Sequence, residues 1–323
     1  MDNTLTPDSL RSRGLGSVSS SAQRLIQASV SENTKVTYDH VLSKLEEWLG
    51  GRALADALLS EYLTSCHDQG MAPASIALIP AAVRFAARLV GDNAPIGPLS
   101  ERTLAGIRRE GRQRGRGQAT GITFTETKFL VGQIAKHGVR GIRDAALFSL
   151  MSDCMLRISE LVAVRPADIE AVPDESGRLY IAQSKTDQEG SGATLYIGPP
   201  TMERIHEWTH LIIEQLGDVE SDKPLFRSVW RGGHIQTKGI SGRGVRKNLK
   251  AYVDEAGLRG QYRGHSFRVG TAQSLAQRGA TLTQMQTVGR WQTARMPAAY
   301  CRNELAGRNA VATLLYKNEM EPN

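Results

Sequence analysis

A segment of eight residues with no apolar side chain divides this chain and constrains its fold more than any other feature. Residues 111–118 read GRQRGRGQ, with three glycines and three arginines. Such a segment has no side chain to bury in a core, and its glycines leave the backbone free. At 323 residues the chain is long enough for two domains of ordinary size. We therefore expect residues 111–122 to be a basic linker between two separate cores.

The residues before this linker show helical periodicity and no strand alternation. Between residues 32 and 49 the apolar side chains recur at helical spacing, and Gly50 and Gly51 follow them. Further helices are expected over residues 53–69, 73–90 and 99–110. Residues 1–20, which are rich in serine and glycine, are expected to form a disordered tail. Residues 21–110 are thus predicted to form a helical domain.

The residues after the linker, 123–323, are predicted to form a mostly helical domain with a small β-sheet. Residues 178–183 and 193–197 have the pattern of short strands joined by a polar turn. One helix is expected to begin near Thr125. The other predicted helices cover residues 140–153, 200–216, 240–256, 267–278, 282–289 and 293–302, and a last amphipathic helix covers 304–316. The fold class is therefore mainly α, in two domains.

Basic residues are concentrated in two clusters. The whole chain carries a net charge of +7, yet residues 227–268 hold ten Lys and Arg against two acids, a net of +8. Residues 102–116 hold six arginines and one acid. Two such clusters indicate a polyanion partner such as double-stranded DNA, with a solvated basic face as the plainer alternative. The candidate DNA contacts are Arg84, Arg88, Arg112, Arg114, Arg116, Arg243 and Lys247.

Several protein classes do not fit this composition. No apolar run approaches the ~20 residues that span a bilayer, so no membrane partner is expected. The first residues do not show the basic and then apolar pattern of a secretory signal. The three cysteines are far apart and form no CxxC motif, which favours a reducing compartment. We therefore expect a cytoplasmic protein.

Six residues of the second domain could together cut a DNA strand. Phosphodiester cleavage needs a nucleophile, a proton donor for the leaving oxygen and cations at the phosphate. Guanidinium groups match phosphate oxygens in two-point contacts, and a cationic environment makes tyrosine a nucleophile. These six residues are Arg157, Lys185, His265, Arg268, Trp291 and Tyr300. Each alone has an ordinary explanation in packing, capping or surface charge.

The strings that hold these residues resemble the tyrosine recombinase, or phage integrase, family. They are RISEL at 157–161, KT at 185–186, GHSFRVG at 264–270, GRW at 289–291 and YCRN at 300–303. The resemblance extends from about residue 30 to about residue 317 and is closest to the Cre-like branch. Many integrases carry histidine where this chain carries Trp291, and tryptophan at this position favours that branch. It also excludes an acid–base role for this side chain.

The resemblance implies a site-specific DNA recombinase that cuts and rejoins strands without ATP, metal or another cofactor. By this resemblance Tyr300 would attack the scissile phosphate and form a 3′-phosphotyrosyl link. Arg157 and Arg268 would hold the non-bridging oxygens. Lys185, in the turn between the two predicted strands, would protonate the leaving 5′-oxygen.

The same resemblance implies supporting residues and an assembly. His265 would donate to the phosphate and assist proton transfer, Glu160 would orient the basic residues, and Trp291 would donate its indole N–H to a phosphate oxygen. The two domains would form a C-shaped clamp on DNA with an inverted-repeat site. Four protomers would join two sites, exchange strands through a Holliday junction, and dock through residues 304–316. A bacterial, phage or plasmid origin is expected, and accessory proteins and the target sequence stay open.

Other functions remain as alternatives. A type IB topoisomerase uses similar chemistry to relax DNA without exchanging partners, and an inert DNA-binding protein could share the fold. His206-Glu207-Trp208-Thr209-His210 fits the HExxH pattern of zinc peptidases, with both histidines on one helix face. No extended motif supplies a third ligand after it, so two histidines on a helix surface are the better interpretation.

Overall fold

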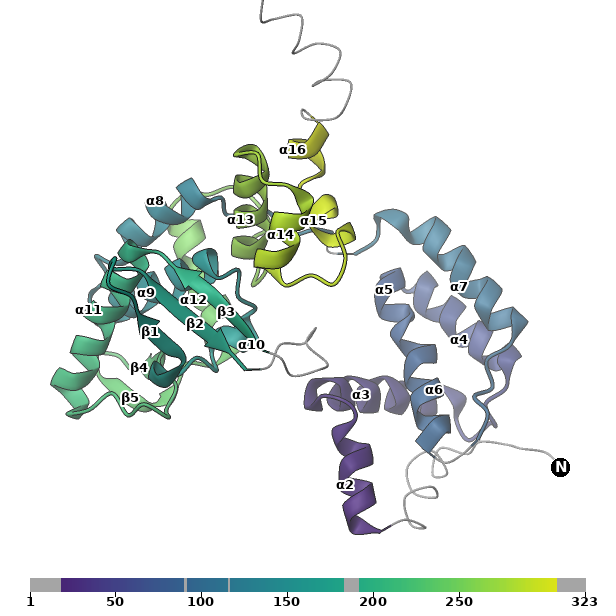
Figure 1. Ribbon diagram of the computed structural model, residues 1–323. Helices are drawn as coiled ribbons and strands as arrows, with labels where there is room; N and C mark the ends of the chain where they lie inside the picture. Colours follow the sequence, from purple (N-terminus) through teal and green to yellow (C-terminus); the bar gives the residue numbers. More distant parts are fainter. Residues whose placement is uncertain (1–18, 90–91, 116, 183–191, 307–323) are drawn as a thin grey trace, which may run out of the picture. The chain divides into compact units, whose positions relative to one another are not determined.

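The computed structural model describes residues 19–89, 92–115, 117–182 and 192–306 (Figure 1). Between Gly117 and Gln118 the chain divides into two compact units. Among the described residues, none of the helices has the length and apolarity needed to cross a membrane. Residues 1–18 of the predicted tail and 307–316 of the predicted last helix lie outside this described part. The roles predicted for the tail, linker and docking helix therefore stay predictions.

The first unit is helical throughout its described residues. Its elements are α2 (Ser20–Ala28), α3 (Glu32–Leu49), α4 (Asp56–Asp68), α5 (Pro73–Ile76), α6 (Leu78–Leu89), α7 (Pro98–Glu110) and the 3-10 turn η1 (Gly111–Gln113). Helix α3 packs on α6, and α4 packs on α7. Their apolar faces meet in one core that includes Leu45, Leu59 and Ile76. The exposed arginines of α6 and α7 therefore lie on helices that are anchored to this core.

One carboxylate ties α4 to α7. Asp56 accepts hydrogen bonds from the backbone N–H groups of Gly97, Leu99 and Ser100, and from the Ser100 hydroxyl at 2.6 Å. Burial alone would raise the pKa of Asp56, but these hydrogen bonds outweigh it and lower the pKa to about 2. Asp56 thus satisfies the orphan N–H groups at the start of α7 from a different helix.

The single helix predicted over residues 73–90 is wrong, because the structure has two. Helix α5 ends at Ile76, and α6 begins at Leu78. Pro80 has no amide hydrogen to donate to the carbonyl of Ile76, so a continuous helix would lack this bond. The chain therefore bends at Ala77.

The second unit is mainly helical with two small antiparallel sheets, which confirms the predicted fold class. Its helices are α8 (Phe124–Ile134), α9 (Gly138–Asp153), α10 (Ile158–Leu161), α11 (Pro199–Leu216), α12 (Gly242–Glu255), α13 (Ser266–Gln277), α14 (Leu282–Gly289), α15 (Arg295–Tyr300) and α16 (Arg302–Ala306), with the 3-10 turn η2 (Pro166–Asp168). Its strands are β1 (Ile169–Ala171), β2 (Gly177–Ile181), β3 (Ala193–Ile197), β4 (Arg227–Val229) and β5 (Ile235–Gly239).

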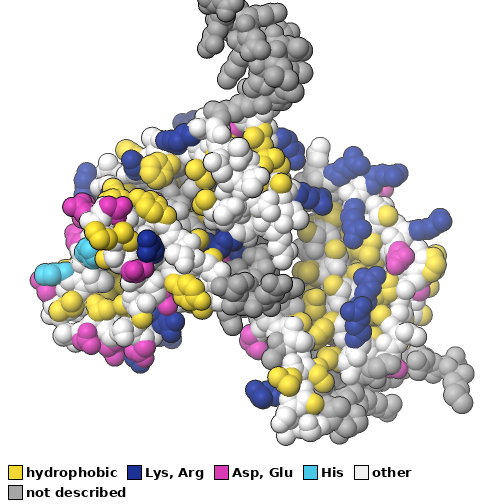
Figure 2. Space-filling view, in the orientation of Figure 1, with side chains coloured by type: hydrophobic (Ala, Val, Ile, Leu, Met, Phe, Trp, Pro, Cys, Tyr) yellow, Lys and Arg dark blue, Asp and Glu magenta, His cyan; other side chains and the backbone are white. Residues whose placement is uncertain are grey.

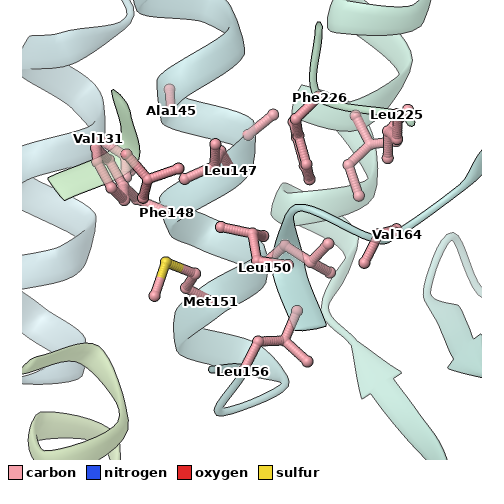
Figure 3. Close-up of a cluster of buried hydrophobic side chains, with 14 of the residues drawn as sticks. Val131, Ala145, Leu147, Phe148, Leu150, Met151, Leu156, Val164, Leu225 and Phe226 are labelled. Carbon is pink, nitrogen blue, oxygen red and sulfur yellow. The ribbon is translucent and has the colours of Figure 1, made fainter. Parts of the chain in front are cut away.

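Helix α9 is the centre of this unit. It is buried almost continuously from Arg143 to Ser152, and α8, α11 and α13 pack against it. Figure 3 shows Leu147, Phe148 and Leu150 of this helix in the core, near Leu225 and Phe226. Because α9 is packed on all sides, its C-terminal end is held in a fixed position. The candidate site is built around that end.

The larger sheet has the order β1-β2-β3, with Leu179 paired to Leu195. Along β2 buried and exposed residues alternate, so one face of the sheet packs on the core. Strands β2 and β3 agree with the prediction, although β2 begins at Gly177 and ends at Ile181. Most of the predicted turn at 184–192 lies outside the described residues.

Several short elements were not predicted. Strands β4 and β5 form a hairpin whose turn contains Gly232 and Gly233, both with positive φ. Strand β1 and helix α10 have only three and four residues, too few for a periodic signal. The predicted helix 293–302 is also wrong in extent, because α15 ends at Tyr300 and Cys301 leaves helical geometry at φ −108°.

Candidate active site

Arg157 lies directly before α10, at the end of the turn that connects α9 to α10. Its backbone is extended, with φ −77° and ψ 153°, so its N–H points back to the first turn of α10. That N–H donates to Oε2 of Glu160 at 2.9 Å, and Nη1 of Arg157 donates to Oε1 at 2.6 Å. Glu160 therefore holds both the backbone and the guanidinium of Arg157. The Arg157 side chain keeps 16% of its surface exposed, so a ligand can reach it.

Arg268 lies on the first turn of α13 and is buried, with 2% of its surface exposed. Its Nη1 donates to the carbonyl of Met155 at 2.6 Å, and its Nη2 donates to the carbonyl of Gly289. Burial, followed by the charges of Arg157 and Arg290, lowers the pKa of Arg268 to about 10. The group stays cationic at neutral pH. Its repulsion from nearby arginines makes the site favourable for an anion.

Gly264, just before α13, packs closely against the side chain of Ile158 at the start of α10. A Cβ on Gly264, just before α13, would lie 2.4 Å from Cδ1 of Ile158, the first residue of α10. A side chain at position 264 would therefore force Ile158 to move. The first residues of the second unit also contact α13, because the Ile122 N–H donates to the carbonyl of Ser266 at 2.9 Å. Both arginine-bearing turns are therefore anchored to the core.

Trp291 packs between Arg268 and Tyr300. The guanidinium carbon of Arg268 lies 4.6 Å from the centroid of the Trp291 ring, a cation–π contact. The ring of Tyr300 meets Trp291 edge to face, with centroids 5.7 Å apart. The Tyr300 carbonyl accepts hydrogen bonds from the side-chain amides of Gln118 and Gln273, both at 3.4 Å. Tyr300 itself is half-buried, with its ring against Trp291.

Arg290 is a residue of this cluster to which sequence reasoning gave no role. It lies between Gly289 and Trp291, and its backbone is left-handed at φ 52°. Its Nη2 donates to Oε2 of Glu160 at 2.6 Å, and its Nη1 donates to the carbonyl of Cys154 at 3.1 Å. Its place beside Trp291 was the only sequence signal. The pairing with Glu160 joins residues 130 positions apart.

Glu160 is the one acidic side chain that contacts two of these arginines among the described residues. Its side chain is 5% exposed, and burial would raise its pKa. The charge of Arg290, and then the hydrogen bonds and charge of Arg157, outweigh burial and lower the pKa below its usual range. Glu160 is therefore ionised at neutral pH. Arg157, Arg268 and Arg290 against this single carboxylate leave a net charge of +2 in the cluster.

His265 and Lys185 are the remaining predicted catalytic residues. His265 is exposed and occupies the N-cap position of α13, one turn before Arg268. Lys185 falls outside the described residues. Two contact groups result, Arg157 with Glu160, and Arg268 with Trp291 and Tyr300, and the charges of Arg157 and Glu160 act on Arg268.

The predicted DNA contacts of the first unit are exposed on adjoining elements. Arg84 and Arg88 lie one turn apart on α6, and Arg84 is 3.8 Å from Glu101 of α7. Arg112 in η1 is exposed, Arg114 donates to the carbonyl of His67, and Arg116 falls outside the described residues. Figure 2 shows Lys and Arg side chains spread over one face of this unit. These contacts stay predictions.

In the second unit the predicted contacts Arg243 and Lys247 lie on α12, one turn apart, and both are exposed. The start of α12 packs on α10. Ser241 caps the helix by accepting from the N–H of Gly244 at 3.1 Å. The exposed Arg243 and Lys247 therefore lie on a helix that contacts α10, the helix that follows Arg157.

The HExxH motif lies on α11 with both histidines exposed. His210 lies 3.5 Å from Glu214, one turn later on the same helix. Across the parts of the chain that the structure describes, no three His, Cys, Asp or Glu side chains are grouped to hold a metal ion. The zinc alternative therefore has no third ligand within those parts.

Comparison with known proteins agrees with this geometry. Residues 122–306, more than half of the chain, match the phage integrase family, and the chain belongs to that family. Recombinase cre of Escherichia phage P1 is 23% identical over 223 residues, which cover 65% of this chain and 64% of that protein, just under two thirds of its length. The resemblance drawn from the motifs, including its Cre-like relative, is thus confirmed.

Two further relatives extend the likeness to most of the chain. Tyrosine recombinase XerD of Lacticaseibacillus casei is 22% identical over 268 residues, covering 81% of this chain and 84% of the relative. A crystal structure of the XerH site-specific recombinase, bound to palindromic difH substrate after cleavage, shares the fold with a TM-score of 0.67. That structure is 16% identical, and the match covers 94% of this chain and 87% of the other.

Proposed function

We propose that this chain is a site-specific DNA recombinase that cuts and rejoins strands through Tyr300. The observation that carries the proposal is that Arg268 packs on Trp291, which meets Tyr300, while the nearby charges of Arg157 and its partner Glu160 act on Arg268. A half-buried tyrosine beside a cluster of net charge +2 suits attack on one phosphate group. Membership in the phage integrase family supports the same activity.

The reaction follows from these groups. The Tyr300 oxygen attacks phosphorus, a new P–O bond forms, and the bond to the 5′-oxygen breaks. Arg157 and Arg268 bind the non-bridging oxygens, where charge grows in the transition state. Lys185 is proposed to protonate the departing 5′-oxygen, while His265 donates to the phosphate and assists removal of the proton that the Tyr300 hydroxyl loses on attack. The phosphotyrosyl bond keeps the energy of the broken bond, so another 5′-hydroxyl can reseal the strand without ATP.

Trp291 has a different part in this proposal. Its ring covers Arg268 and meets Tyr300, so it fixes the distance between the cation and the nucleophile. It is also proposed to donate its indole N–H to a phosphate oxygen. We propose that these groups carry out the reaction without a metal or another cofactor.

The partner is proposed to be duplex DNA with an inverted-repeat site, held by both units in a clamp. The relative XerH was crystallised on a palindromic substrate, which supports this type of site. A palindrome requires two protomers per site, so recombination of two sites requires four. We propose that residues 304–316 link neighbouring protomers. Exposed arginines of α6 and α12 would contact phosphates, so binding should weaken steeply with salt.

The test is recovery of covalent protein–DNA adducts from cells that carry the native DNA. Wild type, Tyr300→Phe and Tyr196→Phe are expressed, the adducts are isolated under denaturing conditions, and the attached DNA is sequenced. Tyr196 is a matched control because it is 64% exposed on β3 and belongs to no site contact described above. Wild type and Tyr196→Phe should give adducts at one discrete sequence. Tyr300→Phe should give none, because its ring lacks the attacking oxygen.

Other outcomes separate the alternatives. Adducts scattered without sequence preference would favour a type IB topoisomerase. Adducts that persist in Tyr300→Phe would exclude this tyrosine as the nucleophile. DNA binding without any adduct would favour an inert DNA-binding protein.

A further inference from the structure

Arg290 holds a backbone conformation that its side chain type rarely adopts. Its φ of 52° and ψ of 47° place it in the left-handed region, directly after α14. Such a conformation in a residue other than glycine persists where the surrounding structure holds it in place. The side chain is 8% exposed, so it is not a surface arginine. Its position therefore calls for a role inside the cluster.

The two guanidinium donors of Arg290 contact two elements that carry the site. Nη1 donates to the carbonyl of Cys154, and Arg268 donates to the next carbonyl, that of Met155. These carbonyls lie at the C-terminal end of α9, where the helix dipole favours cations. The second donor, Nη2, reaches Oε2 of Glu160 at 2.6 Å. Arg290 thus connects the end of α14 to the turn that holds Arg157.

Glu160 divides its charge between two arginines. Oε1 accepts from Arg157, and Oε2 accepts from Arg290 and from the backbone of Arg157. In a buried site the attraction of an ion pair is strong, because little water screens it. Without Arg290, Arg157 would be the only side-chain cation that contacts this carboxylate among the described residues. Arg157 would then form a neutral pair with Glu160 and bind a phosphate less well.

We propose that Arg290 is a positioning residue for DNA cleavage: it takes half of the charge of Glu160 and so leaves Arg157 available to the scissile phosphate. This inference rests on the proposed function and deepens it. Arg157 has the donors for this task. Of its guanidinium nitrogens only Nη1 donates to Glu160, and no hydrogen bond of Nε or Nη2 is seen within the described parts of the chain.

The experiment measures formation of the covalent complex on a duplex with the sequence recovered from wild-type adducts. A nick next to the cleaved bond lets the complex accumulate, and the rate is followed by denaturing electrophoresis. The variants are Arg290→Gln, Glu160→Gln and the double substitution. Arg204→Gln is the matched control, because Arg204 lies on α11 and its Nη1 donates to the carbonyl of Pro200. Arg290→Gly, which suits the left-handed backbone, replaces Arg290→Gln if the latter does not fold.

Arg290→Gln should slow cleavage about 100-fold, the usual cost when a reacting group is misplaced by ~1 Å. Adding Glu160→Gln should recover about tenfold or more, because it removes the charge that retains Arg157. A purely structural role predicts the opposite, a further loss in the double variant. That result, or wild-type cleavage by Arg290→Gln, would overturn the inference. If wild type itself forms no complex through Tyr300, the proposed function fails first and this inference fails with it.

Discussion

Gly289→Ala tests whether the Trp291 ring sets the geometry of the site. A Cβ at position 289 would lie 2.2 Å from Cζ3 and 2.3 Å from Cε3 of Trp291. Carbon atoms pack favourably at about 3.5–4.0 Å, so the ring would have to move by about 1 Å. It cannot do so freely, because Arg268 lies 4.6 Å from the ring centroid and Tyr300 meets it at 5.7 Å. We expect a loss of about 1–3 kcal/mol in the free energy of unfolding, as for other overpacked cores.

The same shift should separate Arg268 from Tyr300 and slow covalent-complex formation by about 100-fold. Urea unfolding measures the first effect, and the nicked-duplex assay measures the second. Gly132→Ala is the matched control in the same unit. Gly132 lies within α8 and has open space around its Cβ position, so alanine there should stabilise the protein by about 0.5–1 kcal/mol. A Gly289→Ala protein with wild-type stability and cleavage would refute the reasoning.

Two further predictions concern the cores of the units. Asp56→Ala should lower the free energy of unfolding by about 1–2 kcal/mol at pH 7, because the start of α7 loses its cap. The pKa of Asp56 is about 2 in the folded protein and near 3.8 when exposed, so this stabilisation is present above pH 4 and is lost as the pH falls toward 2. Urea titrations of both proteins at pH 7 and pH 3 check it, and an equal difference at both would contradict it. Tyr252→Phe removes the hydrogen bond from the hydroxyl to Oδ2 of Asp144 at 3.0 Å and should cost about 1–3 kcal/mol in urea unfolding, since the buried carboxyl group loses a donor. An unchanged unfolding midpoint would show that this bond does not stabilise the packing of α12 on α9.

The long helices could be predicted because their signals are local. In α3 the apolar residues repeat over 18 residues and Gly50 ends the helix in a left-handed conformation, so neighbours alone specify the element. Strands β4 and β5 have three and five residues, too few for such a repeat. The break at Ala77 could have been predicted from Pro80, whose missing N–H is also a local signal.

Some features of the candidate site could likewise be predicted from the sequence, and others could not. Sequence alone determined which chemical groups are available, because arginine, histidine and tyrosine in that order already indicate a phosphate-directed reaction. It also determined the family, since the motifs are short and contiguous. Only the tertiary structure decided that Glu160 is shared by Arg157 and Arg290, and that Trp291 lies between Arg268 and Tyr300. The physical reason is that an ion pair or a ring contact depends on distance in space. The residues of these contacts lie on turns that only the packing of α9, α10, α13 and α14 brings together.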